Sequence, residues 1–496
     1  MIFEVDPDSI AALDSLQLVK LMKRLLLAEA RLAGIPLRGA SVPLQITVPD
    51  GGEDGRISWT GGADSTPYVP ARFTILQSKA QDLTKARVKK EVLAKPRKGK
   101  PPALNDAVAE VLANSGAYII FCRQPMTGAK RKALQKAIRD SIKAVGAKPM
   151  AAVAIEVYDA NLIADWVNRH PAVALWLASV RASRNLAGFQ THEGWGRYPD
   201  MSVPWKPSDE PRFAPADRAV PEEERRVKER GSWTYEQASA KVRNFLADPK
   251  AIVRIYGPSG FGKSRFAYEV LNNSGNVSDE IDTASVVYCD GSICSDEVVK
   301  LALECADAAL AAILVVDECN DELHQKLANI VRRTGSRLCL VTMDIETKVL
   351  QASDTLSLRV EKADDKLIGE IAKGVAPKLT DTATRFITEL AEGFPRMAVL
   401  GAQQDGAGRR TLESVEQVLE RIMWAGKPPA QEAQRALQVA ALFEWLGIEG
   451  RVESQAAFVA AQLAEQTTSR FVELSCCRSG RHHLKLLASA ARTGWG

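Results

Sequence analysis

The residues best suited to chemistry lie in one short segment, in which a lysine and a serine end a glycine-rich loop. The segment matches the pattern G-x-x-x-x-G-K-[ST] and consists of Gly257, Pro258, Ser259, Gly260, Phe261, Gly262, Lys263 and Ser264. Such glycines let backbone N–H groups surround phosphate oxygens, while the lysine reaches the β and γ phosphates and the serine hydroxyl is a ligand for Mg²⁺. An apolar run at 252–256 precedes the loop and a helical pattern at 265–271 follows it. The sequence therefore predicts a strand, a phosphate-binding loop and a helix that hold ATP with Mg²⁺.

Two acidic residues are candidates for the catalytic part of the same site. The apolar run 312–316 ends in Asp317 and Glu318. Because Mg²⁺ prefers oxygen ligands and an attacking water needs a base, we expect Asp317 to hold the metal through water and Glu318 to polarise the hydrolytic water. The alternative is a buried strand that simply ends at two solvated acids. Thr342, at the end of the apolar run 338–342, is predicted to sense the γ-phosphate.

A second constellation lies in the first third of the chain. Gln77 and Lys79 are two residues apart in the strand-like run 73–79, so on a strand they point to the same face. A carboxylate near that face, such as those of the segment 50–54, would bind Mg²⁺ together with the Gln77 side-chain carbonyl, while Lys79 orients an attacking water and offsets charge that develops on a phosphodiester. Asp and Q-x-K also occur together by chance, so a purely structural role is the alternative.

The elements that must position these residues follow from hydrophobic periodicity. In the first part, helix-period residues at 16–26 are followed by strand-like runs at 46–48, 57–59 and 73–79, and then by two helix–strand pairs, 103–113 with 118–122 and 130–145 with 152–158. In the second part, strand-like runs at 252–256, 286–289, 313–316 and 338–342 alternate with helical stretches. The fold class is therefore α/β with several domains, and the second part is predicted to be a parallel sheet with helices on both faces. After about residue 365 the pattern is helical only.

A proline-rich segment separates the two parts. Six prolines fall within residues 199–221, a composition that cannot build a helix or a central strand. We predict an α/β domain at 1–183, a linker at 184–231, the nucleotide-binding core at 232–365, a helical lid at 366–430 and a winged-helix-like region with an irregular tail at 431–496. Adjacent Cys476–Cys477 and His482–His483 pairs in that tail lack the usual metal-ligand spacing, so we favour an aberrant or truncated end over a metal cluster.

The charge of the chain is unevenly distributed. The 496 residues carry 65 Lys+Arg against 61 Asp+Glu, a formal net charge of only +4. Residues 79–100 hold nine basic and two acidic residues, and residues 123–148 hold eight basic and one acidic. One such run alone is as well explained by a solvated helix face, but two in the same half favour a surface that binds double-stranded DNA without sequence preference.

Composition also bears on location. The longest apolar run, 308–316, has nine residues, whereas a membrane helix needs about 20. The acidic N-terminus lacks the features of a secretory signal, and the eight cysteines form no Cys-x-x-Cys pair. We therefore expect a cytoplasmic protein with buried thiols and no membrane partner.

The nucleotide-binding part resembles the STAND class of AAA+-related NTPases. Gly393-Phe394-Pro395, after the helical segment 381–392, is similar to the G-x-P motif of that class. The resemblance implies that Pro395 contacts a bound adenine nucleotide, whereas a helix C-cap glycine followed by proline is the structural alternative. The arginine that such proteins use as a sensor is not fixed by the sequence, because Arg332, Arg333, Arg337 and Arg396 all qualify by position.

The first domain resembles the PD-(D/E)xK nuclease fold of the Mrr-like branch, in which Gln can replace the second acidic residue. The resemblance matches Asp54 to the motif aspartate and Glu29, near the end of the first helix, to the helix glutamate. Together with Gln77 and Lys79 these residues would form a Mg²⁺-dependent DNA endonuclease site.

The whole pattern is similar to bacterial antiviral STAND proteins of the AVAST group. The resemblance implies that a phage protein triggers ATP-dependent homo-oligomerisation, which activates the N-terminal nucleases. This chain departs from that plan because it stops soon after the winged-helix region, so no repeat-array sensor is expected. The alternative function is a nucleotide-switched DNA-binding or scaffold protein whose nuclease-like domain is inert.

Overall fold

A computed structural model describes most of the chain up to residue 405. The described residues are 3–44, 53–94, 101–146, 153–181, 186, 188–198, 201, 203, 207, 209–215, 231–272, 281–345 and 354–405. The chain divides into two compact units. The first unit comprises Met1–Tyr198, Ser239–Arg254 and Ala267–Leu356, and the second comprises Pro199–Ala238, Ile255–Phe266 and Ser357–Gly496.

The N-terminal part of the first unit is built on a five-stranded sheet in the order β1-β2-β3-β4-β5. Its strands are β1 Ala40–Ser41, β2 Gly55–Ser58, β3 Phe73–Lys79, β4 Ala117–Cys122 and β5 Ala154–Tyr158. Strand β2 pairs antiparallel with β1 and β3, whereas β3, β4 and β5 are parallel. The strand β3 that carries Gln77 and Lys79 is therefore central.

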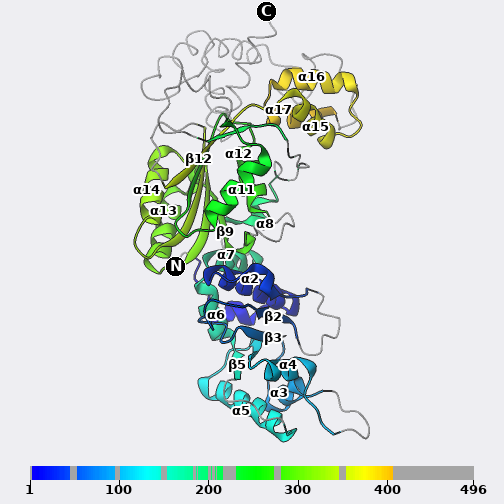
Figure 1. Ribbon diagram of the computed structural model, residues 1–496, viewed down its shortest axis with the longest axis vertical. Helices are drawn as coiled ribbons and strands as arrows, with labels where there is room; N and C mark the ends of the chain where they lie inside the picture. Colours follow the sequence, from blue (N-terminus) through cyan, green and yellow to red (C-terminus); the bar gives the residue numbers. More distant parts are fainter. Residues whose placement is uncertain are drawn as a thin grey trace, which may run out of the picture. The chain divides into compact units, whose positions relative to one another are not determined.

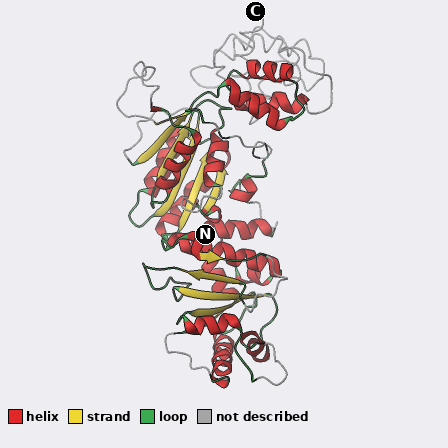
Figure 2. Cartoon of the chain, turned by 45° about the vertical axis from the view of Figure 1, so that its right-hand side comes forward, coloured by secondary structure: helices red, strands yellow, loops and turns green. Residues whose placement is uncertain are grey.

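Helices cover both faces of this sheet, as the red and yellow layers of Figure 2 show. They are α1 Pro7–Ala11, α2 Ser15–Leu32, α3 Lys85–Val92, α4 Asp106–Ala113, α5 Gly128–Ala144, α6 Ala160–Asn168 and α7 Pro171–Val180. Alternation along β3 and β4 sends Leu76 and Phe121 into a core with α2, α6 and α7. Ile75 and Tyr118 enter the opposite core with α3, α4 and α5.

A second sheet has seven strands in the order β6-β9-β10-β11-β8-β12-β7. They are β6 Gln190–Thr191, β7 Phe213–Pro215, β8 Ile252–Tyr256, β9 Val286–Asp290, β10 Ala311–Asp317, β11 Arg337–Asp344 and β12 Thr355–Val360. Strands β9, β10 and β11 of the first unit are parallel and in register, with Val315 opposite both Tyr288 and Val341. The boundary between the units runs through β8 and β12.

Two longer helices of the first unit pack beside these parallel strands, α13 Gly291–Asp307 and α14 Asp321–Val331 (Figure 1). The remaining elements are the helix α8 His192–Trp195, the short helix η3 Thr283–Ser285, and α11 Tyr235–Leu246 and α12 Lys263–Leu271 on either side of β8 in the sequence. The second unit contains a helical bundle of α15 Asp365–Val375, α16 Asp381–Ala391 and α17 Pro395–Asp405, with its own small core.

Within the first unit, the N-terminal part and the second sheet share one hydrophobic core. Helices α2 and α7 contact η3, and α7 also contacts β9 and β10. Buried residues of α2 and α7 belong to the same cluster as Val287 and Leu314. Arg31 donates to the Leu246 carbonyl at 3.1 Å, and Arg337 donates to the Leu32 carbonyl at 3.2 Å. Residues 1–183 are thus packed directly onto strands that follow residue 232.

The α/β class and most of the predicted elements are confirmed. The four predicted strands of the second sheet correspond to β8, β9, β10 and β11, and the described chain after residue 365 is helical. The range predicted to be a linker instead contributes β6, which pairs with β9, and β7, which pairs with β12. Both are short strands at the ends of the sheet order, where a missing N–H of proline is tolerated.

Other predicted features lie outside the described residues: the strand at 46–48, the winged-helix-like region 431–496 and its Cys/His tail. The six cysteines that the structure describes are all free and buried, as expected for core thiols. None of the described helices is long and apolar enough to cross a membrane.

Candidate functional site

The glycine-rich loop after β8 depends on backbone conformations that favour glycine. Gly257, Gly260 and Gly262 have φ of 146°, 85° and 91°. A Cβ atom at Gly257 would lie 2.6 Å from the carbonyl oxygen of Val360, which is a backbone atom and cannot move aside easily. The loop is therefore specified by its glycines.

Lys263 begins α12 directly after this loop. Its Nζ donates to the carbonyl oxygens of Gly257 at 2.8 Å and Pro258 at 3.1 Å, and the residue is 9% exposed. The N–H of Phe266 bonds to the Gly262 carbonyl at 2.8 Å, so the helix continues from the last glycine. Lys263 and Ser264 thus occupy the first turn of a helix, where backbone N–H groups and the helix dipole favour anions.

The Gly393-Phe394-Pro395 motif lies against the loop within the second unit. The Phe394 ring contacts the Phe261 ring edge-on, with centroids 4.7 Å apart. The N–H of Arg396, in the first turn of α17, donates to the Gly260 carbonyl at 3.2 Å. Gly393 has φ of 83°, and a Cβ there would lie 2.7 Å from the Ala363 carbonyl oxygen. The motif is therefore more than a helix cap, because it joins the lid helices to the glycine-rich loop.

The four candidate sensor arginines differ in surroundings. Arg332 pairs with Asp354, Arg333 pairs with Asp307, and Arg337 donates to the Leu32 carbonyl. Only Arg396 of these four is bonded to the glycine-rich loop, through its backbone.

Arg212, which no sequence pattern singles out, also contacts the glycine-rich loop. Its guanidinium donates to the carbonyl oxygens of Phe261 at 3.1 Å, Glu361 at 2.9 Å and Lys362 at 3.2 Å. Burial lowers the pKa of Arg212 to about 10, while the negative charges of Asp364 and Glu361 act to raise it. The guanidinium therefore stays charged at neutral pH. A residue in the range predicted to be a linker thus fixes both the loop and the segment that leads from β12 to the lid helices.

The predicted acidic pair ends β10 in the first unit. Asp317 is half-buried and lies opposite Asp290, the last residue of β9. Glu318 is exposed and has φ of 47°, a left-handed conformation that is uncommon for a residue other than glycine. The N–H of Glu318 donates to Asp317 Oδ1 at 3.0 Å. The strand therefore ends in a sharp, strained turn that exposes the glutamate.

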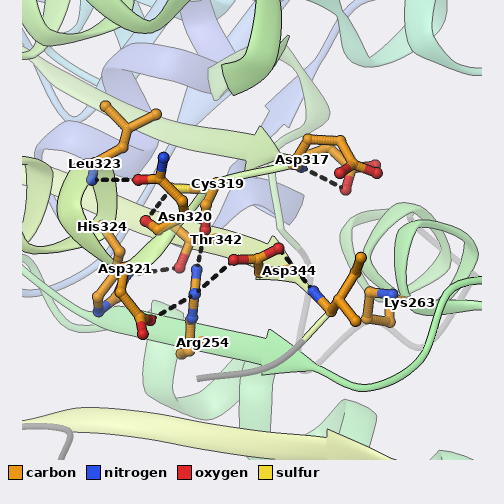
Figure 3. A network of polar contacts seen from close by, with 12 residues as sticks. Arg254, Lys263, Asp317, Cys319, Asn320, Asp321, Leu323, His324, Thr342 and Asp344 are labelled. Atoms are coloured by element: carbon orange, nitrogen blue, oxygen red, sulfur yellow. Dashed lines mark hydrogen bonds and ion pairs between the residues drawn. The ribbon is translucent and has the colours of Figure 1, made fainter. Parts of the chain in front are cut away.

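Thr342 lies in a different environment from the one its predicted role suggests. It is fully buried, and its hydroxyl bonds to His324 Nδ1 of α14 at 2.8 Å. The residue that ends β11 is Asp344, which pairs with Arg254 of β8 (Figure 3). Burial raises the pKa of Asp344, and the Ile345 N–H and Arg254 oppose that shift.

In the N-terminal part, Asp54, Gln77 and Lys79 are brought together. Asp54 Oδ2 accepts from the N–H of Ser78 at 2.8 Å, between the two residues of the Q-x-K pair. Gly55 opposite Leu76 sets the register that places Asp54 beside Gln77. Lys79 Nζ pairs with Glu91 Oε2 of α3 at 2.8 Å.

Glu91 was not among the predicted site residues, yet it contacts both members of that pair. Its Oε2 also accepts from Gln77 Nε2 at 2.9 Å, while Gln77 Oε1 accepts from the Tyr118 hydroxyl at 2.5 Å. The Gln77 carbonyl, which we expected to bind Mg²⁺, is thus already bonded to a tyrosine. In the sequence, Glu91 stands out only as one of two acidic residues within a basic run. The residues that it contacts become visible only from the packing of α3.

Glu29 is placed apart from this group by its described contacts. It is 1% exposed and bonds to Trp166 Nε1 at 3.0 Å and His170 Nε2 at 3.2 Å. Burial would raise the pKa of Glu29, but the hydrogen bond and charge of His170, with Thr66 and Trp166, bring it below its ordinary value. No described contact joins Glu29 to Asp54, Gln77 or Lys79.

The described helices of the two basic runs, α3 and α5, lie beside each other and form a basic surface. Its exposed cationic residues are Lys85, Arg87, Lys89, Lys90, Lys130, Lys132, Lys136, Arg139 and Lys143. Arg131 is different, because it pairs with the fully buried Asp159 at 3.1 Å. Apolar residues of both helices point inward to the core, so the positive charge is concentrated outside.

Metal binding at these sites would need ligands from the substrate as well as from side chains. Over the described part of the chain, no group of three or more His, Cys, Asp or Glu residues is arranged to hold a metal ion. Mg²⁺ bound with a nucleotide or a phosphodiester commonly takes one or two carboxylates and completes its shell with phosphate and water. Asp54, Asp317 and Ser264 fit that mode, in which the substrate supplies the remaining ligands.

Comparison with known proteins gives distant similarity only. No protein-family model and no curated protein matches the chain. A STAND protein with a tetratricopeptide repeat sensor from Pyrococcus horikoshii is similar over 51% of this chain and 44% of its own, at 12% identity and a TM-score of 0.26. The FIGL-1 AAA domain in complex with ADP is similar over 45% and 89%, at 13% identity and 0.26. The S. cerevisiae Hsp104:casein complex is similar over 48% of both chains, at 13% identity and 0.28.

Proposed function

We propose that the protein binds and hydrolyses ATP as a P-loop NTPase of the STAND type. The observation that carries this proposal is the glycine-rich loop itself, with its three left-handed glycines, Lys263 at the start of α12 and the Gly393-Phe394-Pro395 motif packed on it. The glycines and Lys263 match the needs of phosphate binding and were expected from the sequence, whereas the contact of Phe394 with the loop is known only from the structure.

The roles of the residues follow from their chemistry. Lys263 would neutralise the β and γ phosphates, Ser264 would hold Mg²⁺ directly and Asp317 through water, and Glu318 would polarise the attacking water and accept its proton. Bound Mg²⁺ would offset charge on the phosphates. Pro395 would contact the adenine, and Arg396 would be the sensor arginine, because the bond from its backbone N–H to Gly260 places the residue beside the loop. Thr342 would sense the γ-phosphate only if its hydroxyl exchanged the bond to His324 for one to the phosphate.

We further propose that the N-terminal part is a Mg²⁺-dependent DNA endonuclease. Asp54 would hold the metal, Lys79 would orient the attacking water, and Glu91 would supply the acidic side chain that Gln77 does not. The adjacent salt bridge of Lys79 with Glu91 supports this arrangement. The basic surface of α3 and α5 would hold the backbone of double-stranded DNA.

Control by the nucleotide completes the proposal. ATP binding would drive homo-oligomerisation in the cytoplasm, with a phage protein as trigger, and assembly would activate the nucleases in antiviral defence. The shared core of α2 and α7 with β9 and β10 supports a rigid connection between the nuclease-like part and the strand that precedes Asp317.

One observation favours the alternative, a nucleotide-switched DNA-binding or scaffold protein. The Gln77 amide is held by Tyr118 and Glu91, and Gln removes a negative charge that nuclease metal sites use. In that case Glu91 and Lys79 only stabilise the packing of α3 on β3.

Cleavage of a supercoiled plasmid with Mg²⁺, with and without ATP, tests the proposal when the mass of the assembly is measured in parallel. We expect ATP to raise both the mass and the cleavage, and Lys263→Ala to abolish both responses. DNA binding without cleavage in an ATP-dependent assembly would support the alternative.

A further inference from the structure

We propose that Arg254 is a positioning residue for ATP hydrolysis. Its side chain holds the turn after β10, from which Glu318 projects. The proposal rests on the ATPase activity proposed above. Arg254 lies in β8, three residues before the glycine-rich loop, and its side chain is completely buried. Burial of an arginine side chain inside a strand lowers the stability of the fold unless the charge is paired. The groups that pair with Arg254 therefore show which part of the structure it stabilises.

Those partners all belong to the segment that follows Glu318 or to the end of the neighbouring strand. Nη1 donates to the Cys319 carbonyl at 2.6 Å, and Nη2 pairs with Asp321 Oδ1 at 3.0 Å and Asp344 Oδ2 at 3.4 Å. Figure 3 shows the guanidinium between these three groups. One side chain thus joins β8, the turn after β10 and the end of β11.

The hydrogen bonds of the Cys319 peptide groups connect the Arg254 contacts to the conformation of Glu318. The N–H of Cys319 donates to the Met343 carbonyl at 2.8 Å, and its carbonyl accepts from Arg254. Cys319 is fully buried, whereas Glu318 beside it is exposed and left-handed. A strained conformation persists only where its surroundings fix it. The bonds on both sides of Cys319 fix the direction in which Glu318 leaves the sheet.

Arginine is better suited to this position than lysine. Its planar group donates from separate nitrogens to a carbonyl and two carboxylates at once, whereas an ammonium is a single point of charge. Asn320 then caps α14 by accepting from the Leu323 N–H at 2.9 Å, so the turn is fixed at its far end as well. The Arg254 contacts are therefore the link between strand β8 and the catalytic turn.

The test compares ATP turnover with nucleotide affinity in the full chain. Arg254→Lys and Arg254→Met are measured with wild type by steady-state phosphate release and by binding of a fluorescent ADP analogue, and melting temperature monitors folding. Asp321→Asn, whose side chain is 23% exposed, provides a milder change from the partner side. We expect turnover to fall at least tenfold in Arg254→Met and less in Arg254→Lys and Asp321→Asn, with ADP affinity within threefold of wild type.

A second measurement separates positioning from general stability. In a Glu318→Gln background, Arg254→Lys and Asp321→Asn should cause no further loss of turnover, because both act through Glu318. Wild-type turnover in folded Arg254→Lys and Asp321→Asn proteins would overturn the inference, and so would losses that multiply with that of Glu318→Gln. A wild-type protein that neither binds nor hydrolyses nucleotide would instead contradict the proposed function itself.

Discussion

The glycine-rich loop and the nuclease-like site are specified in different ways. The loop is a continuous segment whose function depends on backbone conformation. The sequence shows its glycines, and three of them adopt the left-handed conformation in the structure. The nuclease-like site combines side chains from the residue before β2, from β3 and from α3, and its hydrogen bonds depend on how these elements pack. A site made by the backbone can be recognised from a motif, whereas a site made by distant side chains needs the fold.

The largest expected effect is the loss of DNA cleavage on substitution of the nuclease-like site. Asp54→Ala and Lys79→Ala should each reduce plasmid cleavage to background, because one removes the metal ligand and the other the cation beside the phosphodiester. Cleavage is measured with Mg²⁺ and ATP, with Lys20→Ala, an exposed lysine of α2, as the control. Both variants should still bind ATP. Retained cleavage in either would show that these residues serve only the packing of the sheet.

The loop side predicts a separation of binding from turnover. Glu318→Gln should slow ATP hydrolysis by about a hundredfold or more, as expected for loss of a general base, while ATP binding persists. Single-turnover hydrolysis of labelled ATP measures the rate, with Glu297→Gln on α13 as a control. Hydrolysis at the wild-type rate would remove Glu318 from the mechanism.

A smaller effect concerns the buried carboxylate that the sequence placed at the nuclease site. The pKa of Glu29 is lowered in the folded protein, so the ionised group contributes stability above its unfolded value, and this is lost as the pH falls through the folded pKa. Glu29→Gln should therefore flatten the loss of stability that begins as the pH falls below about 5, just above the unfolded pKa of a glutamate. Denaturant unfolding across that range measures it, with Glu370→Gln as an exposed control. An identical acid dependence in the variant would refute the role of the His170 contact.

The smallest effect tests whether the basic surface binds DNA. Reversal of Lys89, Lys90, Lys130 and Lys132 to Glu should reduce the salt dependence of DNA binding, since each phosphate contact contributes a slope of about −0.9 in log–log form. Arg131 is left unchanged because it pairs with Asp159. Fluorescence anisotropy of labelled duplex DNA over a salt series gives the slope. An unchanged slope would identify these residues as solvated helix faces.

The sequence predicted the parts of the fold that have a strong period. The parallel strands β9, β10 and β11 each contain a continuous apolar run, as expected where both faces of a sheet are covered. Strand β8 is apolar apart from Arg254 and Tyr256, and all four strands were recognised. Helix α3 was not recognised from the sequence. Only Val88 and Val92 of its residues are buried, and five of the other six are charged, so its apolar period is weak. Strand β12 has exposed and half-buried positions, which made its pattern weak.

The sites show the same division. The glycine-rich loop and Gly393-Phe394-Pro395 were found as motifs, and the structure brings them together through Phe261 and Gly260. Glu91, Arg212 and Arg254 were missed because each acts through contacts with residues far away in the sequence. The family resemblance matched Glu29 to the helix glutamate of the nuclease fold, and the described contacts of its carboxylate are with Trp166 and His170.

The central claim is that residues 257–264 bind ATP, and one measurement tests it directly. Isothermal titration calorimetry of the full chain with ATP and Mg²⁺ compares wild type, Lys263→Ala and Lys300→Ala, an exposed lysine of α13. Loss of charge-assisted hydrogen bonds worth about 1.5–3 kcal/mol predicts a Kd roughly tenfold to a hundredfold weaker in Lys263→Ala. Lys300→Ala should bind as wild type does. Equal affinity in Lys263→Ala and wild type, or no binding to wild type, would contradict the claim.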